Sequence, residues 1–119
     1  MREIKFRGKR IDNGEWVYGY YVAYRVTGGG KLYHYIKNTE YTYKVVPETV
    51  GQFLEHKDVC GIPMYEGDIL ENYYEARGVI EFDTDRFLWI HGENWGEIEP
   101  KRDKLEIIGI IHDNPELLK

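Results

Sequence analysis

The side chains that could perform chemistry in this chain are few and scattered. The 119 residues include four histidines and one cysteine: His34, His56, His91, His112 and Cys60. A zinc site needs about three or four ligands, and only His56 and Cys60 lie near each other in sequence, among turn residues that disfavour a shared helix. A lone cysteine is usually a small apolar residue rather than a nucleophile. We therefore expect no metal site, no cofactor, no catalytic residue and no enzymatic activity.

Acidic side chains in the second half offer the other possible chemistry. They are Glu66, Asp68, Glu71, Glu75, Glu81, Asp83 and Asp85. Paired carboxylates can transfer protons or hold Mg²⁺, so one alternative function is a metal-dependent hydrolase that uses these acidic loops. Carboxylates at turns more often accept hydrogen bonds from local backbone. We favour that structural interpretation and expect Asp68 to fix the tight turn formed with Glu66 and Gly67.

Tyrosines are concentrated in the first half, where eight of the eleven lie between Tyr18 and Tyr43. Alternation along a strand places Tyr18 with Tyr20, Tyr33 with Tyr35, and Tyr41 with Tyr43 on shared faces. These six tyrosines are our candidate binding residues, because a thin layer cannot bury them all and tyrosine is enriched at protein interfaces. Tyrosine can also stack on bases. The competing interpretation is that they form cross-strand pairs that only stabilise the sheet.

Charge is distributed unevenly along the chain. Residues 1–60 carry 10 Lys and Arg against 7 Asp and Glu, or +3, whereas residues 61–119 carry 6 against 14, or −8, which together give the net charge of −5. Arg2, Lys5 and Arg7 are further candidate binding residues in a basic N-terminal segment. Nucleic-acid binding depends on neutralising phosphates, so the overall acidity makes a nucleic-acid-binding module the less favoured alternative. A solvated edge strand protected by its charges would explain the same residues.

The order of apolar, turn and aromatic residues predicts a mainly β protein. Strands are expected at 4–7, 15–26, 32–37, 41–46, 62–65, 69–70, 79–82, 87–90 and 105–111, with Gly109 marking a bulge. Pro47 should end the fourth strand, separating an N-terminal β-hairpin layer (1–46) from a small barrel (47–119), and a short helical turn should start at Pro115. Barrel core candidates are Ile69, Val79, Ile80, Phe82, Leu88, Ile90, Ile107 and Ile110.

Composition places the chain in the class of folded, non-membrane proteins. It is 42% hydrophobic and 15% aromatic, which suits a chain with a packed core. No apolar run is long enough to span a bilayer, and the first residues lack the apolar stretch of a secretory signal. A single cysteine fits a reducing compartment, so we expect a cytoplasmic location and no membrane partner.

Several segments resemble the YopX family of phage and prophage proteins. They are the opening 2–7, then 50–53, Lys57-Asp58, Gly61 to Ile69, 78–83 and the ending 105–118. Leu54-Glu55-His56 departs from the family pattern, which has a Thr-Gly-Leu-like turn before Lys57. The resemblance implies a two-part fold with an SH3-like β-barrel at the C-terminus, a mobile-element origin and a cytoplasmic location. It implies no established activity and supplies no catalytic residues.

These observations leave three classes of function. The favoured hypothesis is a non-catalytic protein-binding or self-assembling module, whose partner is a second copy of the chain or a host or phage protein. The alternatives are the nucleic-acid-binding module, which would use the basic N-terminus and the tyrosines, and the metal-dependent hydrolase.

Overall fold

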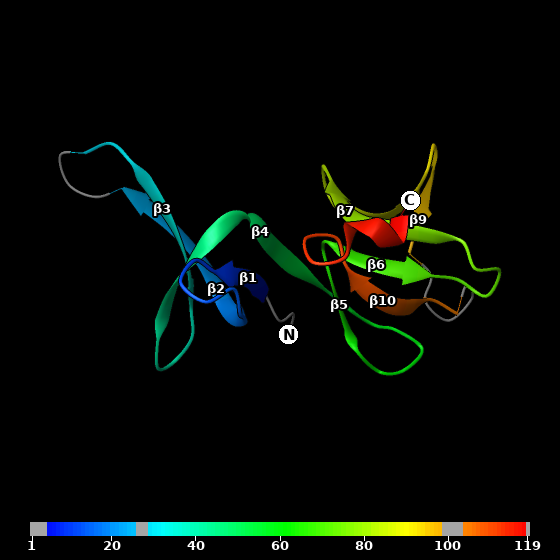
Figure 1. Ribbon diagram of the computed structural model, residues 1–119, viewed down its shortest axis with the longest axis horizontal. Helices are drawn as coiled ribbons and strands as arrows, with labels where there is room; N and C mark the ends of the chain where they lie inside the picture. The colour runs from blue at the N-terminus through cyan, green and yellow to red at the C-terminus, as the bar shows by residue number, and fades with distance from the viewer. Residues whose placement is uncertain (1–4, 26–28, 99–103, 119) are drawn as a thin grey trace. The chain divides into compact units, whose positions relative to one another are not determined.

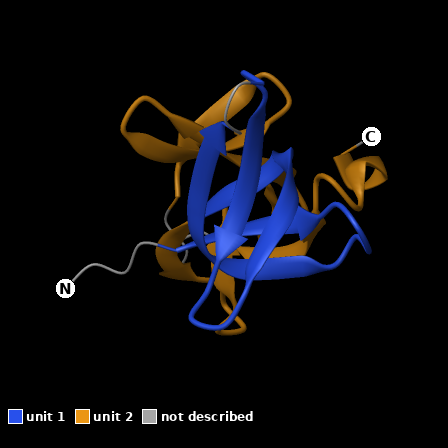
Figure 2. Cartoon of the chain, turned by 90° about the vertical axis from the view of Figure 1, so that its left-hand side faces the viewer, with its two compact units in different colours: residues 1–52 blue, residues 53–119 orange. Residues whose placement is uncertain are grey.

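The fold is mainly β, as the sequence predicts. The computed structural model describes residues 5–25, 29–98 and 104–118, and these ranges contain ten strands and one 3₁₀ helix (Figure 1). The chain divides into two compact units, unit 1 (residues 1–52) and unit 2 (residues 53–119), coloured separately in Figure 2. Arg2, Thr27 and Gly28 lie outside the described residues. No helix within the described ranges is long and apolar enough to cross a membrane.

Unit 1 is a closed circuit of strands rather than an open layer of hairpins. Its strands are β1 (Phe6–Arg10), β2 (Trp16–Arg25), β3 (Leu32–Lys37) and the first part of β4 (Thr42–Lys57). Antiparallel pairs join β1 to β2, β2 to β3 and β3 to β4, and β4 also pairs with β1. The expectation that the basic N-terminal segment is an edge strand is therefore wrong, because Phe6 lies opposite both Gly19 and Gln52.

The small core of unit 1 forms where these strands approach closely. Ile36 and Val45 are almost completely buried. Gly8 lies between them, and a Cβ atom at that position would come within 3.1 Å of both side chains. The ring of Phe6 packs against Tyr21 with centroids 5.8 Å apart. A glycine on β1 therefore allows the strands to close around two aliphatic residues.

Pro47 does not end the fourth strand. β4 runs through it to Lys57, so residues 47–53 are extended. The boundary between the two units along the chain falls within β4, between Gln52 and Phe53.

A bulge explains how β4 accommodates the proline. The pairing of β1 with β4 shifts register between Arg7 and Lys9. At this shift the hydroxyl of Thr49 accepts a hydrogen bond from the Lys9 N–H at 2.8 Å and donates one to the Val46 carbonyl at 2.6 Å. Pro47 has no N–H to contribute to a ladder, and bulges are among the few places in a sheet that tolerate proline.

Unit 2 contains a five-stranded antiparallel sheet. Its elements are β5 (Pro63–Tyr65), β6 (Asp68–Glu71), β7 (Arg77–Asp83), β8 (Arg86–His91), β9 (Asn94–Glu97), β10 (Glu106–Ile110) and the 3₁₀ helix η1 (Pro115–Leu118). The sheet has the strand order β10-β6-β7-β8-β9, and β5 pairs with the end of β4. The SH3-like character of this unit stays a prediction.

The main core of unit 2 lies on one face of this sheet. It consists of Leu54, Met64, Leu70, Ile80, Trp89 and Leu105. Among the expected core residues, Ile69, Ile80 and Leu88 are buried, and Val79, Ile90, Ile107 and Ile110 are half-buried. The expectation for Phe82 is wrong, because its side chain is 46% exposed. Phe82 lies at the far end of β7, next to the turn, where it pairs with Phe87 on β8.

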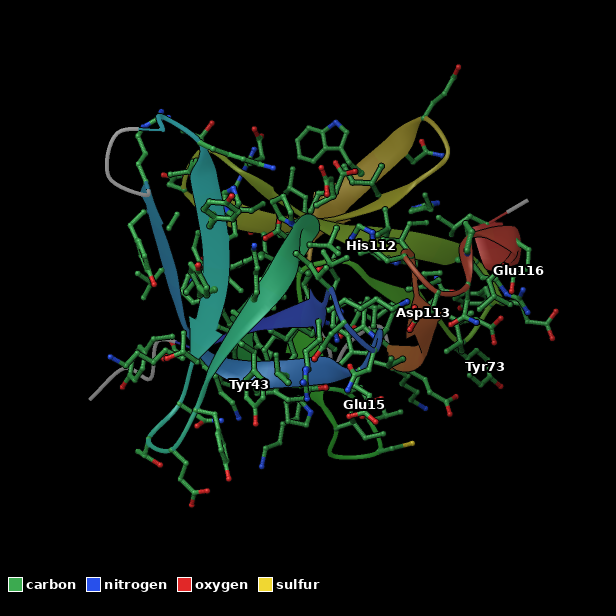
Figure 3. All side chains as sticks on the ribbon, turned by 60° about the vertical axis from the view of Figure 1, so that its left-hand side comes forward. Glu15, Tyr43, Tyr73, His112, Asp113 and Glu116 are labelled. Carbon is green, nitrogen blue, oxygen red and sulfur yellow. The ribbon has the colours of Figure 1, made fainter. Side chains whose placement is uncertain are left out.

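The end of the chain packs on the sheet as the sequence suggests. η1 begins at Pro115, and Figure 3 shows Asp113 and Glu116 around its start. The expected bulge at Gly109 is confirmed, because β10 shifts register against β6 between Ile107 and Gly109. A Cβ atom at Gly109 would approach a methyl group of Leu117 to 2.8 Å. Glycine at this bulge therefore leaves room for the helix.

Candidate functional site

The buried carboxylate of Asp58 holds a turn together through backbone hydrogen bonds. Asp58 is 6% exposed and follows the last residue of β4. Its Oδ1 accepts hydrogen bonds of 2.9 Å from the N–H groups of Cys60 and Ile62, and its Oδ2 accepts one of 3.0 Å from Ile107 on β10. One side chain therefore fixes the 58–62 turn and ties it to the sheet. Within this turn, Gly61 has a φ of 83°.

Asp68 has a similar structural role, which confirms the expectation that it fixes its turn. The side chain is buried, and its Oδ2 accepts a 2.8 Å hydrogen bond from the N–H of Tyr65. Gly67 between them has a φ of 95°, a conformation that glycine adopts without a steric penalty.

The remaining acidic residues do not form a metal centre in the described ranges. Glu71 pairs with Arg77 at 2.7 Å. The described residues contain no group of three or more His, Cys, Asp or Glu side chains arranged to hold an ion.

The histidines and the cysteine lie in separate environments. The Nδ1 atom of His34 lies 2.5 Å from the hydroxyl of Tyr21 in unit 1, whereas the ring of His91 packs against Trp89 in unit 2. Cys60 is exposed, with its Sγ 3.8 Å from Oε1 of Glu106. Partial desolvation and the carboxylates of Glu106 and Asp58 raise the pKa of the Cys60 thiol. A raised pKa disfavours the reactive thiolate.

The register of unit 1 brings aromatic and basic side chains onto one face. Residues directly opposite each other in an antiparallel pair share a face. The pairs are Tyr24 with Tyr33, Val22 with Tyr35, Tyr20 with Lys37, Tyr35 with Lys44, Tyr18 with Arg7, and Trp16 with Lys9. We call these residues, together with Lys5 over the Tyr18 ring, the aromatic-basic face. They include five basic residues and no Asp or Glu.

Cations cover several rings of the aromatic-basic face. The Nζ of Lys44 lies 3.9 Å from the ring centroid of Tyr33, and the Nζ of Lys5 lies 5.6 Å from that of Tyr18. Tyr24 stacks on Tyr35 with centroids 4.8 Å apart. Desolvation by burial and, after it, the contact with Tyr24 raise the pKa of Tyr35.

Exposure shows which members of the face a partner could reach. Tyr20 and Tyr24 on β2 are 66% and 50% exposed, and Tyr18 is also exposed. Tyr33 and Tyr35 are half-buried, and Lys37 and Lys44 are exposed. Arg7 is only 4% exposed and lies 5.0 Å from the Trp16 ring, so its guanidinium offers little surface to a partner.

Two candidate tyrosines lie away from the aromatic-basic face. Tyr43, labelled in Figure 3, lies opposite Ile36 and so shares the other face of the sheet, where the guanidinium of Arg10 approaches its ring to 4.8 Å. Tyr41 precedes β4 and contacts Tyr43. Conversely, the candidate set lacked several members of the face: Lys9, Trp16, Val22, Tyr24, Lys37 and Lys44. Alternation along the strand could have placed Lys37 with Tyr35, whereas Lys44 joins the face only through the pairing of β4 with β3.

The comparisons with known proteins decide the family. The sequence profile of the family described as YopX protein matches residues 5–119. The chain belongs to the YopX family. This family member also resembles the crystal structure of protein EF1440 from Enterococcus faecalis, with a TM-score of 0.61, 19% identity, and coverage of 98% of this chain and 99% of that chain. At this identity the likeness concerns the fold alone. Comparison with curated proteins gives no match.

Proposed function

We propose that this YopX family member is a non-catalytic protein-binding module, and that its aromatic-basic face recognises an acidic surface of a partner protein. The observation that carries the proposal is the strand register, which places four lysines, Lys5, Lys9, Lys37 and Lys44, among exposed tyrosines. The residues assigned to this face include no Asp or Glu. Tyrosines supply large contact areas in interfaces, and complementary charge selects the partner and speeds association. The family resemblance favours a cytoplasmic, phage- or prophage-encoded protein, so the partner would be a phage or host protein.

The geometry of the rings supports a protein partner over a nucleic acid. Stacking on bases needs open ring faces, but lysines lie over one face of Tyr18 and of Tyr33, and Tyr24 and Tyr35 stack on each other, so four of the five tyrosines on this face have a ring face already in contact. The net charge of −5 also opposes a polyanion. A protein surface needs only the edges and hydroxyl groups of these tyrosines together with the lysine ammonium groups.

Affinity capture with matched variants tests the proposal. The chain would be immobilised and exposed to extract of cells that naturally encode it, as wild type and as the double variant Tyr20→Ser/Lys37→Glu. A matched control is Tyr73→Ser/Lys104→Glu in unit 2, because it also removes an exposed tyrosine and reverses the charge of a neighbouring lysine, whose Nζ lies 5.4 Å from the Tyr73 ring centroid. We expect one acidic protein to be retained by wild type and control, and retention by the Tyr20/Lys37 variant to fall about tenfold.

Two further measurements separate the rival outcomes. Light scattering on the purified chain at low and high salt decides whether a second copy is the acidic partner. Titration with single-stranded DNA tests the nucleic-acid alternative. Tight binding that weakens steeply with salt and is lost in the Tyr20/Lys37 variant would show that the aromatic-basic face binds a nucleic acid instead of a protein. A partner retained equally by all three proteins would show that the binding surface lies outside the aromatic-basic face.

A further inference from the structure

Unit 2 contains a hollow that its own core does not use. The hollow has a volume of about 440 Å³ and is bounded by residues of β7, β8 and β9. It is lined by Glu81, Phe82, Asp83, Arg86, Leu88, Ile90 and Trp95. Trp95 is 60% exposed, so its large ring presents area to solvent.

Strand register shows that the hollow lies on the face of the sheet away from the core. Glu81 lies opposite Leu88, and Ile90 lies opposite Trp95. Because Leu88 and Ile90 are two residues apart on β8, these four side chains share one face. The core residues Ile80 and Trp89 lie opposite each other and belong to the other face.

An apolar row on the outer face needs an explanation. Where an antiparallel sheet has one solvated face, that face is usually polar. In β8, however, Phe87 to Ile90 form an unbroken apolar run. Such a run is typical of a strand covered on both faces. Leu88 is already buried, whereas Ile90 is half-buried and Trp95 on β9 is 60% exposed. Ile90 and Trp95 are therefore the part of this face that a partner could cover.

The charges around the hollow define the partner's chemistry. Residues 81–97 contain five carboxylates and one basic residue, Arg86. The guanidinium of Arg86 is engaged, since it lies 3.1 Å from Oε1 of Glu97 and 5.4 Å from the centroid of the Trp95 ring. Glu81 and Asp83 are exposed at the rim. Cationic groups beside an apolar anchor would complement this arrangement.

We propose that the hollow is a docking site for a basic segment of a partner protein. A bulky apolar side chain of the segment packs beside Trp95 over Ile90, and Lys or Arg residues of the segment meet Glu81 and Asp83. This site is independent of the aromatic-basic face, since that face is basic and lies in unit 1.

A peptide titration followed by NMR tests the proposal. The probe is acetyl-Gly-Lys-Leu-Lys-Gly-amide, and two matched peptides replace either both lysines by glutamate or the leucine by glycine. The indole N–H of Trp95 reports on the hollow, and that of Trp16 in unit 1 is an internal control. We expect saturable shifts at Trp95 with a Kd of about 1 mM, binding at least about fivefold weaker without the leucine, and no shift with the acidic peptide.

Variants locate the site. Glu81→Gln/Asp83→Asn should weaken the basic peptide about fivefold, and Trp95→Ala, followed by the methyl signals of Leu88 and Ile90, should do the same. Glu75→Gln, outside the hollow, should leave binding unchanged. The Glu81→Gln/Asp83→Asn variant still tests the proposal if Trp95→Ala fails to fold. Equal shifts with the acidic peptide, or shifts at Trp16 as large as those at Trp95, would overturn the proposal. So would line broadening at Trp95 that grows with protein concentration without peptide, because the occupant would then be a second copy.

Discussion

The hydroxyl of Thr49 accepts a 2.8 Å hydrogen bond from the backbone N–H of Lys9, across the bulge that lets β4 pass through Pro47. The same hydroxyl donates to the Val46 carbonyl at 2.6 Å, and the Thr49 residue is buried. One side chain thus replaces a missing rung of the β1–β4 ladder and helps to close unit 1.

Replacing this hydroxyl should weaken unit 1. Thr49→Val keeps the shape of the side chain but leaves a backbone N–H and a carbonyl without their partner, so the free energy of unfolding should fall by about 1–3 kcal/mol. Urea denaturation followed by tryptophan fluorescence measures the change. Thr42→Val at an exposed position of the same strand is the control, with an expected change within about 0.5 kcal/mol. Equal effects of the two variants would contradict the role assigned to Thr49.

Asp58 should be more important for stability than any exposed carboxylate. Asp58→Ala removes the acceptor of three backbone hydrogen bonds in a buried turn, and the free energy of unfolding should fall by at least about 3 kcal/mol. Asp85→Ala in the exposed β7–β8 turn is the control and should change stability by less than about 1 kcal/mol. Thermal or urea unfolding distinguishes the two, and a mild effect at Asp58 would show that the turn holds without it.

Glu55 stands at the centre of the segment that departs from the family pattern, and its φ is 67°. The β4–β5 pairing shifts register around it, between Phe53 and Lys57. A non-glycine residue pays a steric penalty in this conformation, so Glu55→Gly should raise the free energy of unfolding by about 0.5–1 kcal/mol. Glu81→Gly in the interior of β7 is the control, and it should destabilise by about 1 kcal/mol. Destabilisation by both glycines would show that the Glu55 side chain matters more than its backbone strain.

The thiol of Cys60 should react slowly with iodoacetamide near neutral pH. Desolvation and the carboxylate of Glu106 raise its pKa, so the thiolate forms, and the alkylation rate rises, only at a pH above that of an ordinary cysteine. Glu106→Gln removes a negative charge near the sulfur, which should lower the pKa and increase the rate at pH 8 about two- to fivefold. Glu116→Gln is the control and should leave the rate profile unchanged. A midpoint below that of a model thiol would contradict the assignment.

The sequence by itself determined much of the local structure of this protein. Alternating aromatic and β-branched residues identified the described strands except β9 and the continuation of β4 beyond Pro47. Asp68 identified its turn, Gly109 its bulge and Pro115 the start of η1, because each depends mainly on residues close together in the chain. The segments shared with the YopX family identified the family for the same reason, since they consist of contiguous residues.

Only the tertiary structure decided which residues meet. Nothing local to Pro47 indicates that Lys9 and Thr49 bridge a bulge there, and nothing local to Phe82 places it beyond the core. The aromatic-basic face depends on β2 pairing with β1 along one half and with β3 along the other, which gathers Lys37 and Lys44 beside the tyrosines. The outer-face hollow of unit 2 likewise depends on strand register, because a shift by one residue would turn Leu88 and Ile90 to the opposite face.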